Sequence, residues 1–130
     1  MAKLDYNLIV VPGHWDDLGQ VLSNLGYEYQ EFDDLDDVCR PSVLKNCKAV
    51  FVACGADCGL SNESEKILRN FIKMGGAIYA SDLAFELIET LFPNKVEFDS
   101  DDYDDGIRVN IADPGLVEIL VQPGVNPPAV

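Results

Sequence analysis

The chain has 130 residues, 48% of them hydrophobic, and a formal net charge of -14 at neutral pH. This length is typical of one compact domain, and the hydrophobic content excludes a wholly disordered protein. The strong negative charge disfavours binding to nucleic acids and to anionic membranes, because both are themselves negatively charged. The partners that remain compatible with this charge are basic protein surfaces, metal cations and small neutral or cationic ligands.

The sequence predicts a cytoplasmic protein with reduced thiols. Its apolar runs are far shorter than the ~20 residues that span a bilayer, and we find no signal-peptide pattern. Four cysteines are present: Cys39, Cys47, Cys54 and Cys58. Their spacing does not match the paired C-x2-C pattern of structural zinc sites, and a disulfide framework is not expected in this compartment.

Strands and helices are expected to alternate along the first half of the chain. Residues 6–11 predict a first strand that ends at Pro12-Gly13, and a helix follows, ended by Gly26. The apolar face of this helix is expected to contain Trp15, Leu18, Val21, Leu22 and Leu25. Residues 27–32 predict a more polar strand near the sheet edge. A charged connection then runs to Pro41, with one turn of helix over residues 42–46.

The second half continues the alternation. Residues 48–53 predict a third strand, followed by a loop of small residues. Asn62, with Glu65 three residues later, forms a capping signature for a helix that Gly75-Gly76 ends. This helix is expected to bury Ile67, Leu68, Phe71 and Ile72. Residues 77–80 predict a fourth strand, after which Asp82 is expected to cap a helix that Pro93 ends. The apolar residues of that helix are Leu83, Leu87, Ile88 and Leu91.

The pattern weakens beyond Pro93. Residues 95–98 and 107–112 predict two more strands, separated by an acidic loop over 99–105, and Asp113-Pro114 begins a short last helix. Prolines at positions 123, 127 and 128 predict a non-helical tail. We therefore expect one α/β domain over residues 1–122 and a proline-rich tail over residues 123–130.

This order of elements predicts a three-layer, flavodoxin-like α/β domain with a mostly parallel central sheet. Ligands of such sheets bind beyond the carboxyl ends of the strands. Three loops are expected at that edge: residues 12–15, 54–61 and 80–83.

The segment from Lys48 to Phe92 resembles class I glutamine amidotransferase-like domains, particularly their trehalose-utilisation-like branch. The likeness consists of the run AVFVACG, a helix that ends FIKMGG, the strand AIYASD and a further helix. As a pattern it extends over residues 6–92. It implies a strand, a sharp turn and a helix at the position where the enzymes of this superfamily carry their nucleophile.

The residues of the catalytic triad are missing from this pattern. Members that hydrolyse glutamine carry G-x-C-x-G at the turn, together with a histidine and an acid late in the chain. Here residues 79–83 are Tyr-Ala-Ser-Asp-Leu, and the only histidine, His14, lies in the first loop. The resemblance therefore implies a member of the superfamily without glutaminase activity.

Six side chains are expected to converge at the carboxyl edge and to bind a ligand. They are His14, Cys54, Asp57, Cys58, Ser81 and Asp82. A cysteine with a histidine can serve as nucleophile and base, and Cys58, just before a predicted helix start, is slightly favoured over Cys54. Against a catalytic role, the neighbouring Asp57 would raise the pKa of a thiol, and a loop cysteine usually only fills space.

Other ligands are less well matched by the sequence. Two thiols, an imidazole and a carboxylate suit zinc, but the C-x3-C spacing is loose, and no metal site is predicted. The acidic run at 99–106 resembles a calcium-binding loop, yet Tyr103 and Ala112 occupy positions that need ligands, which favours a solvated loop. Neither glycine motif for phosphate binding occurs, and the acidic surroundings disfavour a generic anion site at Gly55 and Gly59.

The function predicted from the sequence is a non-catalytic, amidotransferase-like binding or assembly module that acts with a partner protein or by self-association. A proline-rich end suits a tether better than a catalytic element. Two alternatives remain. One is a small cysteine-dependent hydrolase or transferase that uses Cys58 or Cys54 with His14, and the other is a thiol-based metal or redox sensor. No cofactor is expected.

Overall fold

The computed structural model describes residues 8–95. The predicted strand at 107–112, the last helix, the acidic loop and the proline-rich tail lie outside these residues. Lys95, placed in a strand by the sequence, lies in a turn.

Four strands form one parallel sheet. They are β1 (Leu8–Val11), β2 (Gln30–Glu31), β3 (Ala49–Val52) and β4 (Ala77–Ala80), in the order β2-β1-β3-β4. Every neighbouring pair is parallel. This order is that of the first four strands of the flavodoxin-like arrangement, so the predicted fold class is confirmed. The polar strand β2 lies at an edge, as its sequence indicated.

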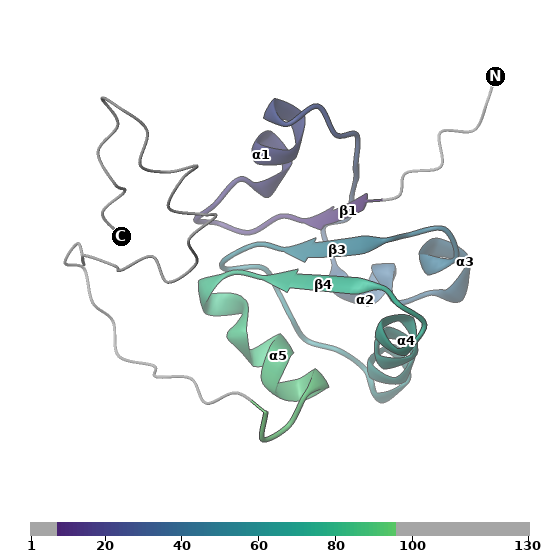
Figure 1. Cartoon of the computed structure of the whole chain (residues 1–130). Coiled ribbons are helices and arrows are strands. Elements are labelled where there is room, and N and C mark those ends of the chain that lie inside the picture. Colours follow the sequence, from purple (N-terminus) through teal and green to yellow (C-terminus); the bar gives the residue numbers. More distant parts are fainter. Residues whose placement is uncertain (1–7, 96–130) are drawn as a thin grey trace, which may run out of the picture. The chain divides into compact units, whose positions relative to one another are not determined.

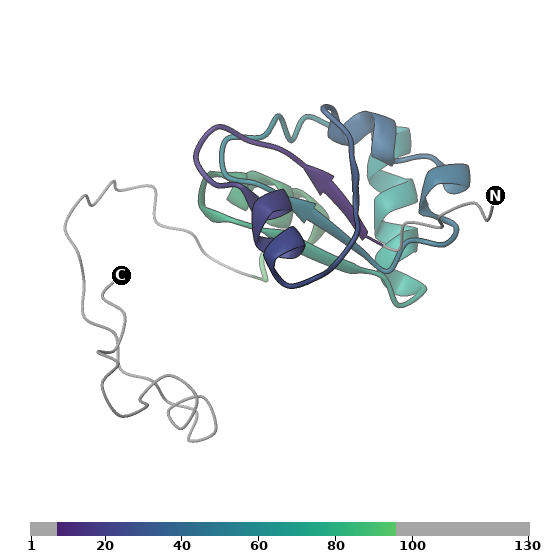
Figure 2. The same ribbon diagram turned by 90° about the horizontal axis from the view of Figure 1, so that it is seen from above.

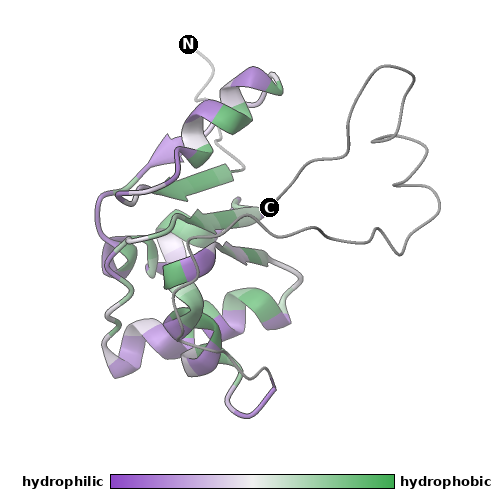
Figure 3. Cartoon of the chain, turned by 90° about the vertical axis from the view of Figure 1, so that its left-hand side faces the viewer, coloured by the Kyte–Doolittle hydropathy of each residue, from purple (hydrophilic) through white to green (hydrophobic). Residues whose placement is uncertain are grey.

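Helices cover the two faces of the sheet unequally (Figures 1 and 2). Helix α1 (Leu18–Asn24) lies on one face. The other face carries α2 (Leu35–Val38), α3 (Pro41–Leu44), α4 (Asn62–Lys73) and α5 (Phe85–Leu91). Figure 3 shows the apolar strands between these two layers, which gives three layers in all. No helix within residues 8–95 is long and apolar enough to cross a membrane.

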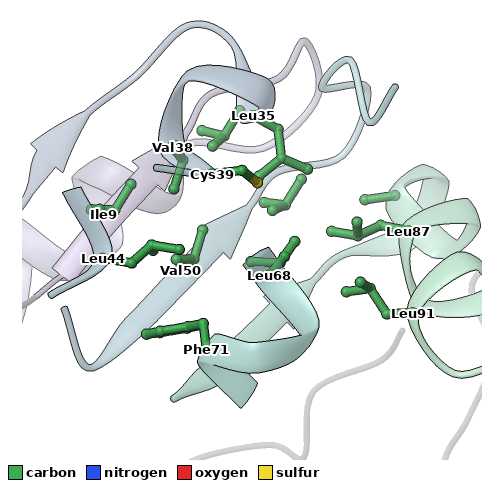
Figure 4. Packing of buried hydrophobic residues seen from close by; sticks show 13 residues of the cluster. Ile9, Leu35, Val38, Cys39, Leu44, Val50, Leu68, Phe71, Leu87 and Leu91 are labelled. Carbon is green, nitrogen blue, oxygen red and sulfur yellow. The ribbon is translucent and has the colours of Figure 1, made fainter. Parts of the chain in front are cut away.

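The main core lies between the sheet and α2 to α5 (Figure 4). Alternate strand residues point toward it, because successive side chains of a strand lie on opposite faces. Ile9, Val11, Val50 and Val52 are at most 1% exposed. Leu68 of α4 and Leu87 of α5 pack against them and are equally well buried.

The structure corrects the predicted first helix. It begins only at Leu18, because the side chain of Asp17 caps it by accepting a hydrogen bond from the amide of Gln20. Trp15 therefore lies in the preceding loop, with 75% of its surface exposed. The prediction was thus wrong for Trp15. Val21 and Leu25 keep the predicted spacing with Leu18 and Leu22 but are mostly exposed.

The segment between β2 and β3 contains two short helices, α2 and α3, where the sequence predicted a charged connection with one turn. Asp34 caps α2, and Pro41 begins α3. Leu35 and Val38 supply the reason for this structure, because the core buries both side chains completely. Because acidic residues surround this apolar pair in the sequence, the pattern did not predict a helix there.

Two helix caps differ from the prediction. Helix α4 is capped by Ser61, whose hydroxyl accepts a hydrogen bond from the amide of Ser64. Asp82 is not a cap: it is the first residue of a 3-10 turn, Asp82–Ala84, that leads into α5. Leu83 consequently remains 48% exposed. The end of α4 was predicted correctly, since Gly75 has the expected positive φ.

Candidate functional site

The loops after β1 and β3 meet through their backbones at the carboxyl edge of the sheet. The carbonyl of Cys54 accepts hydrogen bonds from the amides of His14 (3.0 Å) and Trp15 (3.3 Å). Gly13 permits this approach, because a Cβ atom at this position would lie 2.1 Å from the Cys54 carbonyl oxygen. The small residues of the two loops therefore fix the position of one loop against the other.

Asp16 joins all three loops of this edge. One oxygen of its carboxylate accepts a hydrogen bond from the amide of Cys54 at 2.7 Å. The other oxygen accepts one from the hydroxyl of Ser81, which follows β4. Asp16 was not among the predicted site residues, because only its place after the first strand distinguishes it from the chain's many other acids. Asp16 organises the edge.

Cys54 and Asp82 are brought together across the same edge. The thiol of Cys54 is buried and lies 3.8 Å from Oδ2 of Asp82, to which it donates a weak hydrogen bond. Asp82 is exposed and has a φ of 39°, a left-handed conformation that non-glycine residues seldom adopt. Strand β4 thus ends in a sharp turn whose polar side chains, those of Ser81 and Asp82, contact the loops after β1 and β3.

Asp57 and Cys58 lie further along the loop after β3 and bond within it. The carboxylate of Asp57 accepts a hydrogen bond from the amide of Gly59, and the thiol of Cys58 donates one to the carbonyl of Ala56. Burial raises the pKa of the Cys58 thiol, and the carboxylates of Asp57 and Glu86 raise it further. This thiol is therefore protonated at neutral pH, whereas a nucleophilic cysteine needs a lowered pKa.

His14 is exposed, and its contact with the site is made by its backbone. Among the hydrogen bonds of residues 8–95, none joins its imidazole to a thiol. The same residues contain no group of three or more histidine, cysteine or acidic side chains placed to hold a metal ion. Of the six candidate side chains, the structure brings those of Cys54, Ser81 and Asp82 together around Asp16, whereas those of His14, Asp57 and Cys58 lie in the same loops without bonding to this group.

Trp15 is the most prominent side chain of this edge. Its amide is held by Cys54, and its indole lies against Gly55, where a Cβ atom would be 3.0 Å from Cδ1 of the ring. The side chain nevertheless remains 75% exposed. A large aromatic ring is thus presented to solvent from a loop whose backbone is held in place.

Comparison of the chain with protein-family models, curated proteins and solved structures finds no match.

Proposed function

We propose that this protein is a non-catalytic binding module that acts with a partner protein through the carboxyl edge of its sheet. The observation that carries the proposal is the exposure of Trp15 on a loop tied to Cys54 and Gly55. A tryptophan held in this way can bury a large area with little loss of side-chain freedom, and tryptophans are enriched among the residues that dominate binding at protein interfaces.

The charge around Trp15 defines the chemistry of the partner. Asp57 and Asp82 are exposed at the same edge, and the chain as a whole carries a net charge of -14. A basic partner surface would be attracted to this edge over a long range. The partner is therefore a protein with an apolar pocket for the indole, surrounded by lysine or arginine side chains.

Kinship with the amidotransferase-like superfamily is part of the proposal. It is supported by the flavodoxin-like strand order and by the sharp turn after β4, where Asp82 has a positive φ. A turn of this kind exposes the nucleophile in enzymes that carry one. Here it carries Ser81 and Asp82, and Ser81 donates its hydroxyl hydrogen bond to Asp16. The turn in this protein contributes to a binding surface.

The geometry favours binding over thiol catalysis. The raised pKa of Cys58 argues against the nucleophile favoured by its sequence position, and the buried thiol of Cys54 donates to Asp82. All four cysteines are free. A cytoplasmic location, which the sequence predicts, is part of the proposal.

Trp15 also provides the test, because it is the only tryptophan in the chain. We expect its fluorescence to shift to shorter wavelength when a partner protein, co-purified from the source cells, is added back. The Trp15→Ala variant should lose this partner in size-exclusion chromatography with light scattering. The matched Tyr27→Ala variant should keep it, since Tyr27 is a comparably exposed aromatic residue beyond α1.

A strictly monomeric protein without a co-purifying partner would contradict the proposal, as would a partner retained by Trp15→Ala. A titration of thiol reactivity against pH tests the catalytic alternative separately. We expect the thiols of Cys39, Cys47 and Cys58 to have raised pKa values, because all three are partly or fully shielded from water. One thiol with a pKa well below ~8.5 would support a nucleophile instead.

A further inference from the structure

A second surface of the protein is a groove between α3 and α4. Its volume is about 570 Å3, and it is open to solvent. Figure 1 shows these two helices toward the amino ends of β3 and β4, away from the carboxyl edge of the sheet. The groove is lined by Pro41, Leu44, Lys45, Lys66, Ile67, Asn70, Phe71 and Met74.

The floor and the rim of this groove differ in exposure. Leu44 and Phe71 are less than 10% exposed and belong to the main core, so they form a fixed apolar floor. Met74 at the end of α4 is 81% exposed. Methionine adapts its shape easily and is common on surfaces that bind amphipathic helices. The combination suits an apolar helix face laid along α4, which at 12 residues is about 18 Å long.

The charge of the groove is opposite to that of the protein. The chain contains 23 acidic and 9 basic residues, yet the side chains that line the groove include two lysines and no acid. Within residues 8–95, neither Lys45 nor Lys66 forms an ion pair, whereas Arg40 and Arg69 do. The two ammonium groups are therefore available to a ligand.

A neighbouring hollow limits the direction in which a ligand can lie. It shares Pro41 and Ile67 with the groove, and its charged lining residues are Asp36, Asp37, Glu63 and Arg40, of which Arg40 forms an ion pair with Asp37. An acidic ligand is repelled by the carboxylates of this hollow and attracted by Lys45 and Lys66 of the groove. The surface along α3 and α4 thus combines an acidic hollow with a groove that holds two lysines among its apolar residues.

We propose that this groove binds an acidic amphipathic helix of a partner protein. Apolar side chains of that helix, spaced at i, i+3 or i+4 and i+7, lie over Leu44, Ile67 and Phe71. Its aspartate or glutamate side chains gather beside Lys45 and Lys66. The occupant is a helix, since a groove that is open to solvent leaves a small molecule largely in water.

The probe is a fluorescent peptide of about 15 residues, long enough for four helical turns, with leucines at this spacing and flanking glutamates. A second peptide carries glutamine in place of each glutamate. Binding to the full chain is measured by fluorescence polarisation at physiological ionic strength. We expect the glutamate peptide to bind more tightly than the glutamine peptide.

Two charge-reversal variants test the location of the site. We expect Lys45→Glu combined with Lys66→Glu to weaken binding about tenfold, because two exposed ion pairs are lost and replaced by repulsion. The control combines Lys48→Glu with Lys95→Glu, which changes the net charge equally at exposed positions outside the groove. The control should change the affinity by less than about twofold, because screening weakens distant charges.

Several outcomes would overturn the proposal. They are no binding of the glutamate peptide, tighter binding of the glutamine peptide, and equal losses in both lysine variants. Dimerisation that the groove variant abolishes would show that a second copy of this chain is the occupant. The Trp15→Ala variant should bind the peptide as the unchanged protein does, so that this test and the test of the carboxyl edge can fail independently.

Discussion

The two faces of the sheet differ in how completely the described helices bury them. On the face covered by α2 to α5, Val50 and Val52 have no exposed surface. On the α1 face, Val10 is buried, but Phe51 is only partly buried and Tyr79 is 49% exposed. The rings of Phe51 and Tyr79 pack together with centroids 5.8 Å apart. The covered face therefore holds most of the packing of residues 8–95, although both faces are apolar in sequence.

The difference comes from the lengths and positions of the helices. Helix α1 has seven residues and buries Gly19 and Leu22, whereas the opposite layer contains four helices and most of the buried cluster. A β-strand alternates its side chains between faces whatever covers them, so strand sequence alone does not reveal this asymmetry.

The largest effect should come from the centre of the covered face. Leu68→Ala removes a completely buried side chain that contacts the core cluster, and we expect it to lower the free energy of unfolding by about 2–5 kcal/mol. Urea unfolding measures this change. Tyr79 is a much more exposed residue of the α1 face. A smaller loss for Leu68→Ala than for Tyr79→Ala would contradict the conclusion that the face covered by α2 to α5 holds most of the packing.

The second effect concerns the carboxyl edge of the sheet, where the loops after β1, β3 and β4 meet. Asp16→Asn keeps the size of the side chain but weakens its bonds to Cys54 and Ser81, and leaves one of these donors without a good acceptor. We expect a loss of about 1–3 kcal/mol in the free energy of unfolding. Asp33→Asn is the control, because Asp33 is exposed and belongs to no hydrogen bond of the described residues. Equal stability of the two variants would show that Asp16 does not hold the edge.

A third effect depends on pH and probes burial on the covered face. Burial raises the pKa of the Cys39 thiol from 9.0 to about 12, and the carboxylates of Asp36 and Asp34 add to this rise. Between these values the unfolded chain loses the thiol proton and the folded chain keeps it. Stability is therefore lost as the pH rises above the lower value, by at most about 1.4 kcal/mol per pH unit.

Comparison with Cys39→Ala isolates this contribution from those of the other titrating groups. The variant should be less stable at neutral pH, because it leaves a small cavity, but its stability should decline less steeply in alkaline solution. Urea unfolding from neutral pH to about pH 11 gives both curves. Parallel curves would mean that the thiol is not shielded from water.

The smallest effect is expected on the α1 face. Tyr79→Ala removes a half-exposed ring and its contact with Phe51, and should lower the free energy of unfolding by about 0.5–1.5 kcal/mol. Thermal unfolding monitored by circular dichroism measures it. A cost equal to that of Leu68→Ala would show that the two faces contribute equally.

Much of the fold could be predicted from local patterns. The strand at 77–80 was placed correctly, and those at 8–11 and 49–52 within the predicted ranges, because they are short apolar runs that end at small or polar residues. Helix ends marked by Gly26 and Gly75 were also predicted correctly, since both positions require a positive φ. The exposed face of α1 could not be predicted, because the apolar spacing there does not correspond to a packing partner among the described residues.

The candidate site was predicted less completely than the fold. The rule that ligand-binding loops follow parallel strands correctly indicated that Cys54, Ser81 and Asp82 would meet. It could not indicate Asp16, because the role of this carboxylate depends on the distances between three loops. Nor could it indicate the groove between α3 and α4, since the sequence predicted only a single turn in place of α2 and α3.

The hydrogen bonds of Asp16 also bear on the order in which the protein folds. They join Asp16 to residues 38 and 65 positions away along the chain. Contacts between such distant residues form only after long stretches of chain have been ordered, so we expect this edge to assemble late in folding. A change at Asp16 should then accelerate unfolding while leaving the folding rate nearly unchanged.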